Sequence, residues 1–146
     1  MPNFRKLSDT VLASPQIAAS DIAAAKEAGV VLIVNNRPDG EAPDQPSGEE
    51  IARAAADAGI EYRAIPVTGA GFGAAQVDAM VEALDAAGGP VLAFCRSGTR
   101  STFLWSLAQA KAGGDPEAIS AAAAGAGYDI APIRPEIDML SKGRGG

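Results

Sequence analysis

Residues 95–101, CRSGTRS, gather one cysteine, two arginines and three hydroxyl side chains in seven positions. Cys95 is the only cysteine in the chain, and four residues separate it from Arg100. A cysteine beside cationic groups is held as a thiolate, which is the nucleophilic form of the thiol. A planar guanidinium binds an oxyanion through two parallel hydrogen bonds. These residue types at this spacing predict nucleophilic chemistry on a bound anion.

The positions of this loop have different expected roles. We expect three catalytic residues. Cys95 is the nucleophile, and Arg100 binds the oxyanion through its planar guanidinium. Ser101 hydrogen-bonds the sulfur or stabilises it as a leaving group. Backbone N–H groups of the intervening residues bind the anion, and glycine lets the loop curl tightly. These anion-binding residues are Arg96, Ser97, Gly98 and Thr99. Whether the Arg96 side chain also points inward stays open.

A structural interpretation of Cys95 must be weighed against this one. A lone cysteine after a strand is commonly a small buried apolar residue. The polar and cationic neighbours favour a functional cysteine, and we expect its sulfur to lie ionised at the mouth of the protein. A sulfur walled off from solvent would overturn both enzymatic interpretations.

The elements on either side of Cys95 explain why an anion would bind there. Residues 91–94 are continuously apolar, which is typical of a strand covered on both faces. Beyond the turn, apolar residues recur at helical spacing from Phe103 to Ala108. The first turn of a helix leaves its N–H groups free, and the helix dipole adds positive charge there. The sequence therefore predicts an anion site between this strand and this helix.

The rest of the chain alternates between short apolar runs and helical patterns. We expect strands at residues 11–13, 30–34 and 62–67, and helices at 21–28 (with Ser20 as N-cap), 47–59, 77–88, from 115 onward and after 134. This alternation predicts a single α/β domain over residues 1–146, with a mostly parallel central sheet flanked by helices and a frayed tail at 143–146. Loops that begin at Asn35, Thr68 and Cys95 all follow strands, so they should open on one edge of the sheet.

Composition excludes several classes of function. The net charge of −6 argues against a nucleic-acid surface. The chain has no histidine, which excludes a Ser-His-Asp triad, a Cys-His pair and a histidine-ligated metal; no metal or cofactor is expected. No apolar run approaches the ~20 residues that span a bilayer, and the start lacks a secretory signal. We expect a cytoplasmic protein, unless a leader has been removed, whose alanine-rich helices leave homo-oligomer contacts open.

Residues 95–101 resemble two known active-site loops. In cysteine phosphatases the pattern is cysteine, five residues and arginine, whereas rhodaneses have the shorter form with four residues. The four residues before Arg100 match the rhodanese spacing, and Phe94 stands where a phosphatase usually has histidine. The order of residues 31–37, 64–67, 91–101 and 133–135 is similar instead to dual-specificity phosphatases.

With NNRPDGE at residues 35–41 included, nearly the full chain resembles the phosphatase-like domain of beta-lactamase hydrolase-like proteins, a bacterial family also labelled as candidate sulfurtransferases. The resemblance implies a dual-specificity cysteine-phosphatase fold. It implies a phosphatase-like hydrolase with a cysteinyl-phosphate intermediate, or a sulfurtransferase with a persulfide on Cys95. A module that binds oxyanions without turnover is the third interpretation. The implied substrates are small anions: a phosphate ester, thiosulfate or a persulfide.

One departure from the family pattern concerns the general acid. Dual-specificity phosphatases usually place an aspartate just after the Ile-Pro-Val stretch, where this chain has Thr68 and a glycine. Arg37 and Asp39 form a possible second loop of the site. Arg37 adds to the anion site or pairs with a surface carboxylate, and Asp39 replaces the acid or belongs to the turn. We expect Glu41 to be solvated.

Overall fold

The protein folds around a five-stranded sheet. The computed structural model describes residues 3–68 and 71–145, and its strands lie in the order β1-β2-β5-β3-β4. The strands are β1 (Arg5–Ser8), β2 (Val11–Ser14), β3 (Leu32–Asn35), β4 (Glu61–Ala64) and β5 (Val91–Phe94). Strand β1 runs antiparallel to β2, and all other neighbours pair in parallel. The predicted α/β fold with a mostly parallel sheet is confirmed.

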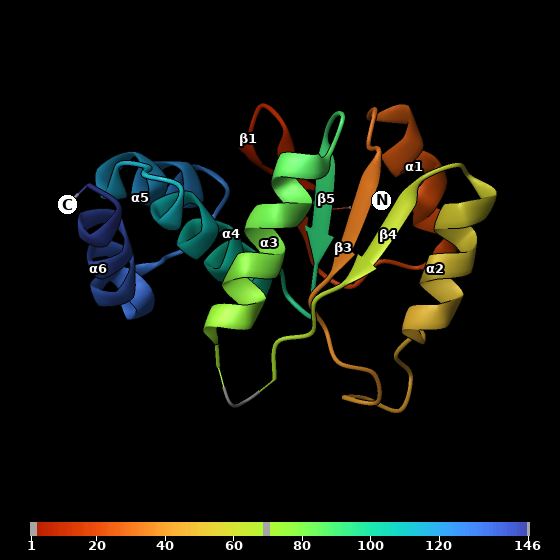
Figure 1. The fold of residues 1–146 in the computed structure, drawn as a ribbon. Helices are drawn as coiled ribbons and strands as arrows, with labels where there is room; N and C mark the ends of the chain where they lie inside the picture. The colour runs from red at the N-terminus through yellow and green to blue at the C-terminus, as the bar shows by residue number, and fades with distance from the viewer. Residues whose placement is uncertain (1–2, 69–70, 146) are drawn as a thin grey trace.

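Helices cover both faces of the sheet (Figure 1). On one side lie α1 (Ile22–Glu27) and α2 (Gly48–Asp57); on the other lie α3 (Ala74–Ala86), α4 (Thr99–Lys111), α5 (Pro116–Gly125) and α6 (Arg134–Gly145). Short 3-10 turns at Ala19–Asp21 and Ala131–Ile133 precede α1 and α6. Each layer of helices therefore needs its own apolar contact with the sheet.

The two central strands supply those contacts through alternating side chains. In β5, Val91 and Ala93 join the larger apolar cluster, whereas Leu92 and Phe94 join the smaller one. The neighbouring strand β3 divides in the same way, since Leu32 and Ile33 enter different clusters. Burial on both faces is the reason these strands appear in the sequence as continuous apolar runs.

The parallel register aligns the ends of the strands that carry the candidate loop. Asn35 pairs with Phe94 on one side and with Ala64 on the other. The residues that follow these three positions therefore leave the sheet together, at its lower edge in Figure 1. The predicted convergence of the loops after β3, β4 and β5 is confirmed for their described residues.

Several boundaries differ from the sequence-based expectation. Strand β1 was not predicted at all. Ser20 is not a helix N-cap, because the 3-10 turn begins one residue earlier and the carboxylate of Asp21 instead accepts the N–H of Ala18 at 2.8 Å. The caps at Ser47 and Asp115 are confirmed, since each side chain accepts a backbone N–H in the first turn of its helix. Helix α6 includes residues 143–145 of the expected tail, and Gly146 lies outside the described residues.

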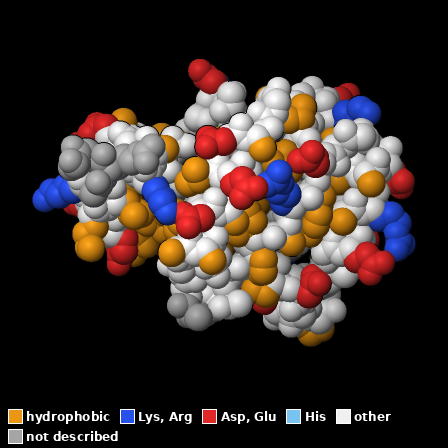
Figure 2. All heavy atoms as spheres, viewed as in Figure 1, with side chains coloured by type: hydrophobic (Ala, Val, Ile, Leu, Met, Phe, Trp, Pro, Cys, Tyr) orange, Lys and Arg blue, Asp and Glu red, His pale blue; other side chains and the backbone are white. Residues whose placement is uncertain are grey.

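Charged side chains are dispersed over the surface. On the face shown in Figure 2, Lys and Arg side chains lie singly among acidic and hydrophobic ones. Positive charge is therefore not gathered on that face. No helix in the described part of the chain is long and apolar enough to cross a membrane.

Candidate active site

The loop after β5 closes tightly around the sulfur of Cys95. Gly98 adopts the left-handed region, with φ of 93°, immediately before α4 begins at Thr99. This conformation turns the N–H of Gly98 back to the Cys95 Sγ, at 3.1 Å. The loop thus supplies a backbone donor to the sulfur, as an anion-binding turn would.

Tyr128 holds this loop from outside. Its hydroxyl donates to the carbonyl oxygen of Ser97 at 3.1 Å, and the Arg5 guanidinium lies 5.3 Å from the centre of its ring. Burial raises the pKa of Tyr128, and the nearby Arg5 charge lowers it in part. The hydroxyl therefore stays protonated and can donate at neutral pH. Nothing in the sequence pattern pointed to Tyr128.

Replacing Gly98 with alanine should destabilise the protein by more than the ~1–3 kcal/mol that a strained backbone conformation costs by itself. A Cβ on Gly98 would also lie 2.9 Å from the Tyr128 Cζ and overlap its hydroxyl. Urea unfolding measures the loss. Gly40→Ala is the matched control, because Gly40 has a φ of 78° and no atom near its Cβ position. Equal losses in the two variants would contradict the contact with Tyr128.

The Arg100 guanidinium is fixed by Glu41 and by the chain after β4. Its Nη1 and Nη2 donate to the two carboxylate oxygens of Glu41, each at 2.8 Å. Its Nη1 also donates to the carbonyl oxygen of Val67 at 2.9 Å. The hydrogen bond with Glu41 raises the pKa of Arg100, and the nearby Cys95 side chain adds to that effect. Arg100 therefore lies within electrostatic reach of the sulfur.

Glu41 is exposed, as we expected, but its carboxylate is also paired with two arginines. Besides its two bonds from Arg100, it accepts the Nε–H of Arg37 at 2.9 Å. Hydrogen bonding from Arg100 is the main reason that the pKa of Glu41 falls to about 2. The side chain of Gln45 fixes the loop, because it accepts the Glu41 N–H and donates to the carbonyl of Pro38. Glu41 is therefore an ionised part of the site.

Arg37 and Asp39, the two residues of the expected second loop, have different hydrogen-bond partners. Arg37 is buried and reaches the site indirectly, by binding Glu41 through Nε and the side chain of Gln16 through Nη1. Asp39 points elsewhere, since its carboxylate accepts the N–H of Gly48 at the start of α2. Within the described residues, no hydrogen bond joins Asp39 to Cys95 or to Arg100. Its contacts are those of a turn and a helix cap.

Ser101 ties α4 to the ends of two strands. Its hydroxyl donates to the Oδ1 of Asn36 at 2.7 Å, and the Asn36 amide donates to the carbonyl of Ile65 at 2.9 Å. Both polar side chains are fully buried. In the described part of the chain, no hydrogen bond joins Ser101 to the Cys95 sulfur. The sequence placed Asn36 in a loop but gave no sign of this network.

The remaining loop residues offer backbone rather than side-chain donors. The Arg96 side chain is exposed, and the hydroxyl groups of Ser97 and Thr99 hydrogen-bond each other at 3.0 Å. Several backbone N–H groups, by contrast, find no acceptor among the described residues. These are the N–H groups of Arg96, Ser97, Arg100 and Ser101. They remain available to a bound anion.

Cys95 itself is enclosed, which contradicts our expectation of a sulfur at the mouth of the protein. Its side chain has no exposed surface. Yet among the described residues it belongs to neither apolar cluster, and its sulfur accepts an N–H and lies near the Arg100 guanidinium. Part of the enclosure is the loop itself, whose Gly98 N–H lies against the sulfur. Neither enzymatic reaction can take place at a sulfur closed off in this way, so each requires an opened form of the loop.

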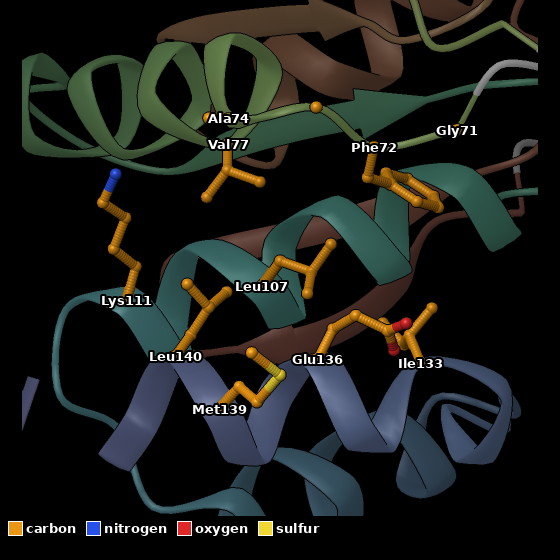
Figure 3. Close-up of a pocket in the computed structure, with 11 residues that line it drawn as sticks. Gly71, Phe72, Ala74, Val77, Leu107, Lys111, Ile133, Glu136, Met139 and Leu140 are labelled. Atoms are coloured by element: carbon orange, nitrogen blue, oxygen red, sulfur yellow. The ribbon is translucent and has the colours of Figure 1, made fainter. Parts of the chain in front are cut away.

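A separate apolar groove lies between α3, α4 and α6 (Figure 3). Its volume is about 560 Å³, and its apolar walls include Phe72, Val77, Leu107, Ile133, Met139 and Leu140. Lys111 at its edge forms an ion pair with Asp78. The lining contains no residue of the loop at 95–101, so the groove is distinct from the candidate active site.

Known proteins resemble this chain in both sequence and fold. Residues 3–112 match the family described as beta-lactamase hydrolase-like protein, phosphatase-like domain. A beta-lactamase hydrolase-like protein of Agrobacterium fabrum is 39% identical over 101 residues, which are 69% of this chain and 23% of that protein. One from Xylella fastidiosa is 40% identical over 81 residues, 56% of this chain and 19% of that protein. The chain thus spans less than a quarter of the length of these curated relatives.

Solved structures extend the likeness over nearly the whole chain. The structure of a candidate phosphatase from Neisseria meningitidis has a TM-score of 0.84 and 30% identity, covering 96% of this chain and 99% of that one. The TpbA protein of P. aeruginosa, solved with phosphotyrosine, has a TM-score of 0.67 and 19% identity, covering 99% and 91%. The second likeness shows the fold alone. Since the family match includes most of the chain, this protein belongs to the family of phosphatase-like domains of beta-lactamase hydrolase-like proteins.

Proposed function

We propose that the protein is a cysteine-dependent, phosphatase-like hydrolase in which Cys95 is the nucleophile. The main observation in support is the placement of the Cys95 sulfur, with the Gly98 N–H bonded to it and Arg100 in electrostatic reach. Membership of a phosphatase-like family supports the same function. The substrate is a small phosphate ester. The TpbA complex with phosphotyrosine is an example of such an anion on this fold.

The reaction has two steps with a covalent intermediate. In the first, the Cys95 thiolate attacks phosphorus, so that an S–P bond forms and the P–O bond to the leaving group breaks. In the second, water attacks the cysteinyl-phosphate, the S–P bond breaks, and phosphate and the thiolate are released. Arg100 and the free backbone N–H groups of the loop hold the non-bridging oxygens in both steps.

Among the described residues, this site holds no carboxylic acid that could protonate the leaving oxygen. The segment after β4 contains no carboxylate, and the one beside Arg100 belongs to Glu41, whose pKa of about 2 keeps it ionised. Protonation of a leaving group contributes typically ~10²–10⁴-fold to the rate. The enzyme should therefore favour aryl phosphates, whose phenolates leave without protonation, over alkyl phosphates.

Steady-state hydrolysis by the wild-type protein tests this function. We expect turnover of p-nitrophenyl phosphate, and kcat/KM for an alkyl phosphate lower by about 10²-fold or more. A wild-type protein inactive on small aryl and sugar phosphates would overturn the proposal. Tight phosphate binding without turnover would indicate a binding module instead.

Sulfur transfer is the second candidate function. Its support is the rhodanese-like spacing of four residues between Cys95 and Arg100, together with the missing proton donor. The Cys95 thiolate would attack the outer sulfur of thiosulfate, forming an S–S bond and releasing sulfite as the other S–S bond breaks. A thiol or cyanide would then accept that sulfur from the persulfide. Intact-mass measurement after exposure to thiosulfate tests it, and an unchanged mass would leave sulfur transfer unsupported.

A further inference from the structure

The five N–H donors of Arg100 divide into two sets. A guanidinium carries one N–H on Nε and two on each Nη, all in one plane. Nη1 serves both the Glu41 carboxylate and the Val67 carbonyl, and Nη2 serves the other oxygen of Glu41. Neither Glu41 nor Val67 uses the Nε–H or the second N–H of Nη2. These two donors share one edge of the plane, so they form a bidentate pair that neither Glu41 nor Val67 occupies.

The surroundings of Arg100 indicate where the Nε–Nη2 edge faces. Glu41 binds the Nη1–Nη2 edge of Arg100, and the carbonyl of Val67, which follows β4, accepts the other N–H of Nη1. Cys95, five residues earlier on the same loop, is the other ionisable side chain that acts on Arg100. An anion held in front of the sulfur would therefore meet the Nε–Nη2 edge. Glu41 and that anion would use different donors and would not compete for them.

Glu41 is itself rigidly held. Arg37 is buried, with 6% of its surface exposed. It donates its Nε–H to the Glu41 carboxylate and its Nη1–H to the side chain of Gln16 at 3.1 Å. The backbone N–H of Glu41 is bound by Gln45 at 3.0 Å. A carboxylate fixed at both its backbone and its oxygens can fix its partner in turn. Arg100 is thereby kept from swinging into solvent.

We propose that Glu41 is a positioning residue. It binds the Nη1–Nη2 edge of Arg100 and so orients the Nε–Nη2 edge toward an anion at Cys95. The inference rests on the proposed function insofar as it assumes an anion attacked by that sulfur. The competing role would be an internal anion that occupies Arg100 until substrate displaces it. The division of donors between two edges favours positioning.

Alkylation of Cys95 tests this role without requiring turnover. Iodoacetate and iodoacetamide react at the same carbon, with formation of an S–C bond and loss of iodide, but only iodoacetate is an anion. The ratio of their rate constants therefore reports how well the anion site is aligned with the sulfur. In Glu41→Gln we expect this ratio to fall about tenfold, the effect of losing about one charge-assisted hydrogen bond.

Matched variants separate positioning from a general loss of structure. Glu49→Gln breaks an exposed ion pair with Arg53 and should leave the ratio unchanged. In an Arg100→Ala background, Glu41→Gln should have no further effect on the ratio. Arg37→Gln removes the support behind Glu41 and should lower the ratio in the same direction, which provides a second variant if the first fails to fold. Thermal unfolding verifies that each variant is folded.

Three results would overturn the inference. An unchanged ratio in folded Glu41→Gln would make Glu41 a bystander, and an increased ratio would make it a competitor for Arg100. An equal fall in the Arg100→Ala background would show that the effect does not pass through Arg100. The proposed function fails separately, if wild-type Cys95 prefers iodoacetate but turns over neither aryl phosphates nor thiosulfate.

Discussion

Replacing Cys95 with serine is expected to abolish hydrolysis of p-nitrophenyl phosphate, with a fall in kcat on the order of 10⁴- to 10⁶-fold. A serine hydroxyl needs a base to become a nucleophile, and the chain contains no histidine to serve as one. The Gly98 N–H that now reaches the sulfur can bond a serine oxygen instead, so the loop should keep its shape. The fall in kcat should therefore reflect the loss of the nucleophile and not a change in the fold.

Steady-state kinetics on Cys95→Ser, together with thermal unfolding and phosphate binding, measure this effect. The matched control is Ser106→Cys, which exchanges the same two side chains at a buried position on α4, where the hydroxyl donates to the carbonyl of Thr102 in the same helix. We expect the control to keep activity in proportion to its folded fraction. A folded Cys95→Ser protein that retained a tenth of the wild-type rate would contradict a cysteine nucleophile.

The second large effect is expected in Arg100→Lys, where kcat/KM should fall by about 10²- to 10³-fold. Lysine preserves the charge but cannot reproduce a planar fork. It would also lose the geometry that lets Arg100 bind both oxygens of Glu41 and the carbonyl of Val67 at once. The expected loss in kcat/KM therefore measures the contribution of the planar guanidinium geometry, since the positive charge is the same in both proteins.

Arg96 provides the control for this substitution within the same loop. Its side chain is exposed, and Arg96→Lys should change kcat/KM by less than about threefold. Steady-state kinetics with p-nitrophenyl phosphate compare the two variants directly. Equal effects at both positions would contradict the assignment of Arg100 as the arginine that binds the anion.

Much of the fold follows from the sequence because its central strands are buried on both faces. Continuous apolar runs identify β3 and β5, and their alternation with helices identifies the parallel order. Strand β1 left no such pattern, since only Leu7 among its four residues is fully buried. As an edge strand paired antiparallel with β2, it needs little apolar surface.

The candidate site was predictable where its residues are adjacent in sequence. The loop from Cys95 to Ser101 could be found because residue type and spacing alone carry its chemistry. The partner of Arg100 could not, because Glu41 lies 59 residues away and is one of 18 acidic residues. Only the fold decides which carboxylate meets a given arginine. Asn36 and Tyr128 were missed for the same reason, since each acts through a contact distant in sequence.

The enclosure of Cys95 also depends on the folded loop. Spacing predicted an anion site but not that the folded loop, with its Gly98 N–H on the sulfur, would leave Cys95 without exposed surface. This closure makes opening of the loop part of any reaction. Alkylation of Cys95 by iodoacetate in the folded protein would demonstrate that opening, since the reagent must reach the sulfur.

The most direct test of a nucleophilic Cys95 is mass spectrometry of the acid-quenched protein during turnover of p-nitrophenyl phosphate. We predict a phosphoryl group on the peptide that contains Cys95, present in the wild type and absent in Cys95→Ser. Hydrolysis that proceeds while this peptide stays unmodified, or a phosphoryl group found on another residue, would contradict the mechanism.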